Sequence, residues 1–126
     1  MFDHVSVVVS DYAKSKAFYS QALAPTGHSR LTELRTSTGQ EMAGFCHADG
    51  SDLWISQGHA IHPPIHIAFR VSSRAALDAF YKAAIAAGGR DNGAPGLRPN
   101  YHANYYGAFV LDPDGHNIEA VCHEAV

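Results

Sequence analysis

The sequence has few cysteines, little charge and no long apolar run. Its only two cysteines, Cys46 and Cys122, lie outside any CxxC arrangement, which argues against a disulfide framework and favours buried thiols in a reducing compartment. The net charge of -3 gives no footprint for nucleic acid or an anionic membrane surface. The opening residues, MFDHVSVVVSDYAKS, lack the basic segment and apolar stretch of a signal peptide or a spanning helix. We therefore expect a cytoplasmic protein with no membrane or nucleic-acid partner.

What is present indicates one globular domain. The length of 126 residues is enough for a sizeable core, and 46% hydrophobic residues with 17% charged residues argue against disorder. Nine histidines are many for this length. The question for function is which of them do chemistry.

Residues 3–28 and 65–90 are two copies of one pattern. Aligned without a gap they share 10 identities in 26 positions, and His4 falls opposite His66. Each copy predicts a β-branched strand, then a capped helix that ends near a glycine. Further strands are predicted at 30–34, 41–47 and 52–57 in the first half, and at 105–111 and 117–122 in the second half. Residues 91–96 are rich in turn formers and predict a loop.

A second alignment links the two halves. Residues 48–54 match residues 113–119, and the Asp-Gly pair in each predicts a hairpin turn into a final strand. Each half is therefore predicted to be a βαβββ module, with module 1 at about 1–61 and module 2 at about 65–126. The expected fold is α+β, with the two modules forming a cupped, incompletely closed mixed sheet and helices outside.

Strand alternation brings three candidate metal ligands to one surface. If Val5, Val7 and Val9 face the helix, then His4 faces the other way, and the same argument applies to His66 and to Glu119. Two imidazoles and one carboxylate with open positions form the donor set of a catalytic metal site. Alone, each of these residues would more often be an ordinary polar side chain. The joint pattern favours the metal site.

The tandem modules, the paired His4 and His66, and the closing run DPDGHNIE at 112–119 resemble the vicinal oxygen chelate superfamily. That superfamily includes glyoxalase I, extradiol dioxygenases, fosfomycin-resistance thiol transferases and bleomycin-binding proteins. The resemblance covers essentially the whole chain. It implies that His4, His66 and Glu119 bind one divalent ion (Fe, Mn, Zn or Ni) and that vicinal oxygens of a small-molecule substrate chelate it. It also implies a homodimer, in which the ligands come from one chain or from two.

Residues that depart from the patterns of individual members of the superfamily favour some of its activities over others. Glyoxalase I has a glutamate ligand where this chain has Trp54, which disfavours that chemistry. Leu53-Trp54 and Ser6 resemble the thiol transferases, but no lysine follows Lys82 to help bind a phosphonate. We therefore expect a metal-dependent enzyme of the dioxygenase-like or lyase/isomerase type. The alternatives are a metal-free sequestering protein of the bleomycin-binding type and a fosfomycin-type thiol transferase.

The segment 97–106 combines aromatic, basic and polar side chains. Such a composition suits a lid over a substrate, although a packed loop or a dimer contact would explain it equally well. As a lid, it would supply the proton-transfer candidates His102 and Tyr106. The predicted substrate-binding residues are Ser6, Trp54, Arg98, Tyr101 and Tyr105. The remaining turn histidines are expected to be solvated; they are His28, His47, His59, His62 and His116.

Overall fold

The structure, a computed structural model, describes residues 1–126. The first module contains β1 (His4–Val9), α1 (Tyr12–Ala22), the short 3-10 helix η1 (Ala24–Thr26), β2 (Arg30–Arg35), β3 (Glu41–Cys46) and β4 (Asp52–Gln57). The second contains β5 (His66–Arg70), α2 (Arg74–Ala86), β6 (Arg90–Leu97), β7 (Tyr106–Leu111) and β8 (Asn117–Cys122). The predicted arrangement of two βαβββ modules is confirmed.

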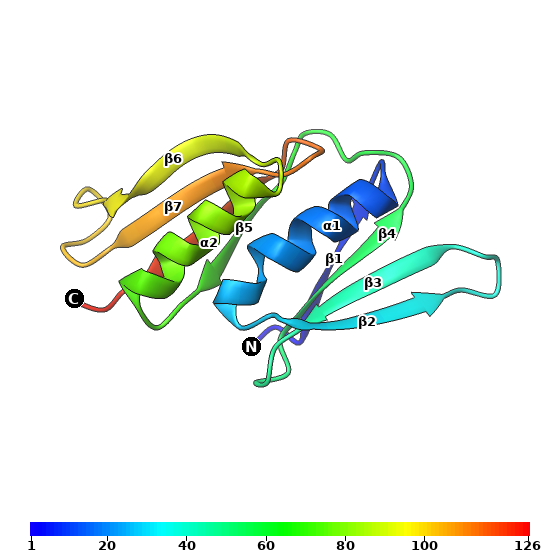
Figure 1. Ribbon diagram of the computed structural model, residues 1–126, viewed down its shortest axis with the longest axis horizontal. Helices are drawn as coiled ribbons and strands as arrows, with labels where there is room; N and C mark the ends of the chain where they lie inside the picture. Colours follow the sequence, from blue (N-terminus) through cyan, green and yellow to red (C-terminus); the bar gives the residue numbers. More distant parts are fainter.

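Each module forms its own mixed sheet of four strands. The first sheet has the order β1-β4-β3-β2 and the second sheet the order β5-β8-β7-β6. In each, the first strand of the module runs parallel to the last, and the other pairs are antiparallel. Figure 1 shows the two sheets on either side of the helices, with α1 and α2 side by side between them. The two sheets remain separate and do not close into a barrel.

The strand register confirms that the two modules are copies of one plan. In the first sheet His4 pairs with Asp52, and two residues further on Ser6 pairs with Trp54. In the second sheet His66 pairs with Asn117, and Ala68 pairs with Glu119. His4 therefore corresponds to His66 in space as well as in sequence. Trp54 and Glu119 occupy the same position on their sheets.

Side-chain caps fix where each helix begins. The carboxylate of Asp11 accepts a hydrogen bond from the backbone N–H of Lys14, and the hydroxyl of Ser73 accepts one from that of Ala76. Both satisfy donors that the first turn of a helix leaves unpaired. Gly88, with φ of 98°, follows α2 in the left-handed conformation that ends many helices.

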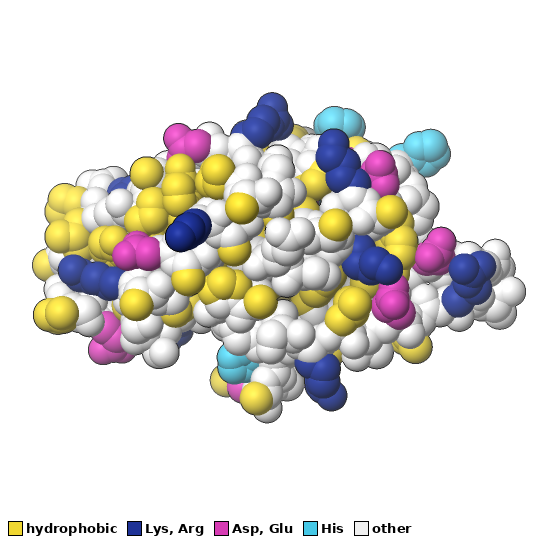
Figure 2. Space-filling model, viewed as in Figure 1, with side chains coloured by type: hydrophobic (Ala, Val, Ile, Leu, Met, Phe, Trp, Pro, Cys, Tyr) yellow, Lys and Arg dark blue, Asp and Glu magenta, His cyan; other side chains and the backbone are white.

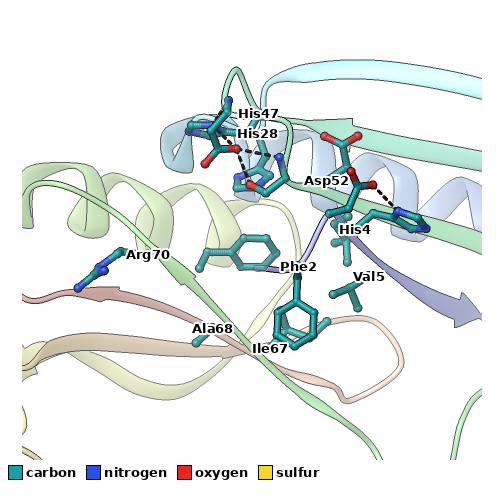
Figure 3. Close-up of a pocket in the computed structure, with 14 residues that line it drawn as sticks. Phe2, His4, Val5, His28, His47, Asp52, Ile67, Ala68 and Arg70 are labelled. Carbon is teal, nitrogen blue, oxygen red and sulfur yellow. Dashed lines mark hydrogen bonds and ion pairs between the residues drawn. The ribbon is translucent and has the colours of Figure 1, made fainter.

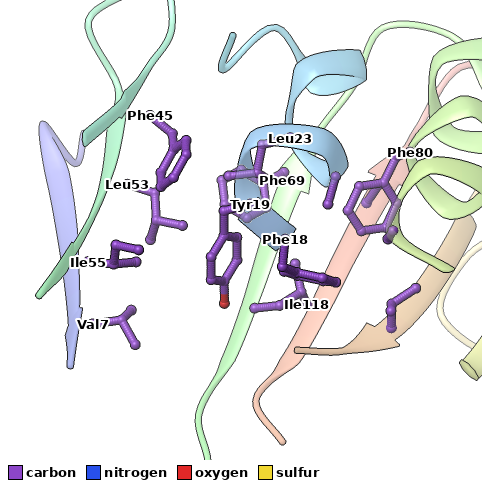
Figure 4. Packing of buried hydrophobic residues seen from close by; sticks show 14 of the residues in the cluster. Val7, Phe18, Tyr19, Leu23, Phe45, Leu53, Ile55, Phe69, Phe80 and Ile118 are labelled. Carbon is purple, nitrogen blue, oxygen red and sulfur yellow. The ribbon is translucent and has the colours of Figure 1, made fainter. Parts of the chain in front are cut away.

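One hydrophobic core joins the two modules. The core contains side chains of both helices and of both sheets, and side chains of both sheets meet around α1, as Figure 4 shows. The rings of Phe18 and Tyr19 of α1 meet edge-on at 5.0 Å, and the ring of Tyr19 is 5.9 Å from that of Phe45 in the first sheet. These three residues and Phe69 of the second sheet are all at least 92% buried. The other face of each sheet has no helix over it. We call it the open face.

Polar contacts also tie the modules together. Asp112, at the turn before β8, is 1% exposed and accepts hydrogen bonds from the Tyr19 hydroxyl of α1 and from the backbone N–H groups of Asp114 and His116. The carboxylate of Asp114 accepts from the backbone and hydroxyl of Ser10 in the first module. The Asp-Pro-Asp-Gly run therefore fixes the relative position of the two modules.

The loop predicted at 91–96 is wrong, because this segment belongs to strand β6. β6 lies at the edge of the second sheet and pairs with β7 through two register shifts, between Asp91 and Gly93 and between Gly93 and Gly96. An edge strand tolerates Pro95, and bulges tolerate glycine, so the turn-forming composition did not prevent pairing. The connection between β6 and β7 is consequently short, from residue 98 to 105.

Candidate functional site

Two of the three predicted ligands lie together on the open face of the second sheet. The Nε2 atom of His66 is 2.8 Å from Oε1 of Glu119, on the neighbouring parallel strand. The side chain of His66 is about half exposed, whereas Glu119 is 1% exposed. A carboxylate so deeply buried requires partners for both oxygens.

Tyr105 supplies the second partner. Its hydroxyl donates a hydrogen bond to Oε2 of Glu119. Burial, together with this bond to the carboxylate, raises the pKa of Tyr105 well above its ordinary value, so the phenol remains a donor. Gly107 leaves room for the contact, since a Cβ there would lie 3.2 Å from the Tyr105 ring and 3.5 Å from Oε2 of Glu119. The carboxylate is thus held with one oxygen toward Tyr105 and the other toward His66.

The third predicted ligand lies elsewhere. His4 is on the first sheet, exposed, with Nδ1 2.7 Å from the carboxylate of Asp3. No three histidine, cysteine, aspartate or glutamate side chains of one chain come close enough to hold a metal ion. The structure therefore brings together His66 and Glu119 but not His4.

The geometry of the pair suits two ligands of one ion. Nitrogen and oxygen ligands lie about 2.1 Å from a transition-metal ion, so two ligands at a right angle are about 3 Å apart. The 2.8 Å separation of Nε2 and Oε1 matches that spacing. Imidazole nitrogen and carboxylate oxygen are also the donor types that suit Fe, Mn, Zn or Ni.

On the first sheet, His4, Ser6 and Trp54 share the open face with Leu34 and Met42, and these five residues line one shallow pocket. The indole of Trp54 lies flat against the backbone of β3, where a Cβ on Gly44 would be only 2.6 Å from the ring. The predicted substrate-binding residues Ser6 and Trp54 are thus neighbours of His4 and not of Glu119.

Residues near the β6–β7 connection gather around Tyr105. The ring of Tyr101 meets that of Tyr105 edge-on at 4.8 Å, and the ring of His102 does so at 5.5 Å. His123, after the end of β8, contacts His102 and Tyr105. Its Nδ1 is 2.8 Å from Nε2 of His102, and its ring is 5.4 Å from that of Tyr105. His123 completes this cluster.

Arg98 and Tyr106 take different positions. The guanidinium of Arg98 donates to the carbonyls of Gly96 and Ala94 and lies over the Phe109 ring at 5.4 Å, so it is fixed on the open face. The hydroxyl of Tyr106 instead donates to Asp78 of α2. Tyr106 therefore faces the helices, away from Glu119, and we assign it no role in the site.

A cavity of about 220 Å³ lies between the modules. Figure 3 shows His4 at one end and Arg70 at the other, with Phe2 between them. Neither His66 nor Glu119 lines this cavity. Within one chain it does not connect the three predicted ligands.

Two turn histidines expected to be solvated are buried. His28 is 8% exposed, with its ring 5.0 Å from Phe69 and 4.9 Å from His47. Burial, followed by the neighbouring His47, lowers the pKa of His28. His116 is fully buried and accepts a hydrogen bond from the backbone N–H of Ile65. His28 and His116 are therefore part of the buried interior, and the composition of the turns did not indicate their burial.

The sequence model of the Glyoxalase/Bleomycin resistance protein/Dioxygenase superfamily matches residues 1–120. The chain belongs to this superfamily. The match spans both modules and includes His4, His66 and Glu119. No curated protein matches the sequence.

Solved structures of the superfamily share the fold. A glyoxalase/bleomycin resistance protein from Albidiferax ferrireducens T118 is 28% identical, with a TM-score of 0.79 over 97% of this chain and 98% of the other. A glyoxylase/bleomycin resistance protein/dioxygenase domain from Frankia sp. EAN1pec is 20% identical, with a TM-score of 0.75 over 98% of both chains. A variant of the fosfomycin resistance protein FosX from Listeria monocytogenes, complexed with Mn(II) and 1S,2S-dihydroxypropylphosphonic acid, is 20% identical, with a TM-score of 0.71 over 98% of this chain and 90% of the other.

The charged side chains on the surface agree with the small net charge of the sequence. Figure 2 shows basic and acidic side chains interspersed over the helix face, without a patch of one sign. Neither helix is long and apolar enough to span a membrane.

Proposed function

We propose that this member of the superfamily binds one divalent metal ion and acts as an enzyme on a small, oxygen-rich molecule. The observation that carries the proposal is the pair formed by His66 and Glu119, 2.8 Å apart on the open face of the second sheet. Glu119 is buried and ready to accept a cation, and its second oxygen is already held by Tyr105.

His4 of a second copy would complete the site. Its place on β1 corresponds to that of His66 on β5, so it is the natural third ligand. Within one chain the bonds from Tyr19 to Asp112 and from Ser10 to Asp114 fix the packing of the two modules, in which His4 does not reach the pair. A homodimer in which the first sheet of one copy covers the second sheet of the other would bring the ligands together. The apolar residues beside His4 on that face, Leu34 at 55% exposure among them, would then be covered.

The chemistry follows from this donor set. A bound divalent ion would supply Lewis-acid polarisation of two vicinal substrate oxygens. The residues of the chain would do the rest. Tyr105 orients the carboxylate of Glu119, and His66 leaves one side of the pair open to solvent. His102 is the candidate proton-transfer group and would act through its hydrogen bond to His123. We favour a dioxygenase-like or a lyase/isomerase reaction.

A metal-free sequestering protein is the second candidate. Exposed or half-exposed aromatic side chains, Trp54 on the first sheet and Tyr101 and Tyr105 on the second, offer flat surfaces for an aromatic ligand. The hydrogen bond between His66 and Glu119 also satisfies both groups without an ion.

Metal analysis separates the two candidates. Protein purified without added ions is compared with His66→Ala and with the control His62→Ala, whose histidine is exposed and lies in the link between the sheets. We expect stoichiometric metal in the wild type and the control and its loss in His66→Ala. Metal that is absent from all three proteins, also after incubation with Fe(II), Mn(II), Zn(II) or Ni(II), would refute the enzyme and leave the sequestering protein.

A further inference from the structure

The proton positions of His102 and His123 are determined by their neighbours. Nδ1 of His102 accepts a hydrogen bond from the backbone N–H of Asn104, at 3.1 Å. That nitrogen therefore has no proton of its own when the ring is neutral, and Nε2 carries it. Nε2 lies 2.8 Å from Nδ1 of His123, so His102 donates and His123 accepts.

The consequence is an N–H group of defined direction on His123. Because its Nδ1 accepts from His102, the neutral ring of His123 carries its proton on Nε2. No side chain or backbone group of the chain accepts a hydrogen bond from that Nε2. The stacking of the two imidazoles, with centroids 5.1 Å apart and planes at 22°, and the edge contact with Tyr105 hold the ring in place.

This donor belongs to the same face as the metal pair. Glu119, Val121 and His123 alternate along β8 and its end, so His123 lies about 13 Å along the strand from Glu119. Tyr105 spans the interval, with its hydroxyl on Glu119 and its ring against His123. The Tyr105 ring thus forms a floor between the metal pair and the free N–H.

A cation lies beside the same floor. Arg98 is fixed over Phe109, whose partner across the strands is Glu119. Its bonds to Gly96 and Ala94 use two of the five guanidinium N–H groups and leave the others free. Arg98 therefore lies at the Glu119 end of the aromatic floor, and the N–H of His123 lies at the other end. An N–H donor there suits an anionic group, because charge-assisted hydrogen bonds are the stronger ones.

We propose that His123, positioned by His102, binds the anionic tail of a substrate whose vicinal oxygens chelate the metal at His66 and Glu119. The substrate class is then a molecule with a chelating oxygen pair at one end and a carboxylate, or a similar anion, at the other. This inference rests on the proposed metal site. His123 is the group that contacts the substrate, and His102 acts through it.

The proton assignment is tested on metal-free protein by NMR. Two-bond ¹H–¹⁵N correlations distinguish the two neutral forms of each histidine ring. We expect the Nε2–H form for both His102 and His123 in the wild type. In His102→Ala the ring of His123 should become a mixture of the two forms, while the control His59→Ala leaves it unchanged. A wild-type His123 with its proton on Nδ1 would overturn the proposal.

Binding of two matched catechols tests the tail site. The probes are 3-(3,4-dihydroxyphenyl)propanoate and 4-propylcatechol, which share the chelating head and differ in the carboxylate. They are titrated calorimetrically into Zn(II)- or Mn(II)-loaded protein without oxygen. We expect the wild type and His59→Ala to bind the acid about tenfold more tightly than the neutral catechol. His123→Ala should lose most of this preference by weakening the acid alone, and His102→Ala should lose part of it.

The outcomes separate this inference from the proposed function. Metal retained by the wild type with no preference for the acid would overturn the tail site and leave the metal site intact. A preference that persists in His123→Ala would do the same. Failure of the wild type to bind metal would instead overturn the proposed function and the tail site with it.

Discussion

The hydroxyl of Tyr19 donates a hydrogen bond to the carboxylate of Asp112, 93 residues further along the chain. Both groups are buried, and the bond joins α1 of the first module to the turn before β8 of the second. Burial and the neighbouring carboxylate raise the pKa of Tyr19 well above its ordinary value, so the phenol is a permanent donor. This contact helps to fix how the two modules pack on each other, with His4 on one sheet and the pair of His66 and Glu119 on the other.

Tyr19→Phe should lower the stability of the fold without changing metal binding. Removing the hydroxyl leaves a buried carboxylate oxygen without a donor, which costs about 1–3 kcal/mol. Urea unfolding gives the free energy of unfolding, and metal analysis gives the occupancy. Tyr81→Phe is a matched control, because the Tyr81 hydroxyl donates to Asp91 at the surface. Equal stability of the two variants would contradict the role given to this bond.

Tyr105→Phe should weaken metal binding. Its hydroxyl holds Oε2 of Glu119, and loss of a group that orients a ligand typically raises the dissociation constant about 10- to 100-fold. Competition with a chromogenic chelator measures the constant for Zn(II). Tyr101→Phe, whose hydroxyl contacts no ligand, should bind like the wild type. Equal Zn(II) affinities of the two variants would contradict this role of Tyr105.

The free energy of unfolding should fall as the pH drops through about 6.5. The pKa of His28 is lowered in the folded protein, by burial and then by His47, whereas in the unfolded chain it is near 6.5. The unfolded state therefore binds more protons below this pH and gains stability relative to the fold, until the folded pKa is also passed. Urea unfolding between pH 5 and 7.5 measures the slope. His28→Gln should flatten it, and His59→Gln, at an exposed site, should not.

Gly44→Ala should displace the only tryptophan of the chain. The new Cβ would lie 2.6 Å from the Trp54 ring, so the indole must leave the surface of β3. We expect a change in tryptophan emission toward that of a more solvated indole and a loss of about 1–3 kcal/mol in stability. An emission spectrum identical to that of the wild type would show that the ring does not lie where the structure places it.

The repeat predicts most of the fold. Alternation along β5 and β8 correctly placed His66 and Glu119 on one face, because regular strands expose every second residue. The same reasoning could not predict their distance from His4. That distance depends on how the two modules pack on each other, through the shared core and the Tyr19–Asp112 bond, and no local pattern encodes this packing.

Strand β6 and the contact of Tyr105 with Glu119 could not be predicted from the sequence. Glycine and proline in residues 91–96 are typical of loops, and the pairing with β7 that overrides this tendency is a contact between strands. Tyr105 and Tyr106 are adjacent in sequence but face opposite sides of the sheet. The sequence pattern does not indicate which of the two tyrosines lies at the candidate site, and only Tyr105 contacts Glu119.

The proposed metal site needs His66 and Glu119 from one chain and His4 from another. The most direct measurement uses two variants, His4→Ala and His66→Ala, carrying different affinity tags. Each variant alone has no complete site. In the mixed dimer, the chain that retains His4 meets the chain that retains His66, so one of the two sites is complete.

We expect each purified variant to lack metal and the purified mixed dimer, refolded or exchanged from the two, to hold one ion. A mixed dimer as free of metal as its parents would contradict the shared site. Metal retained by the His4→Ala dimer itself would show that His4 is not a ligand.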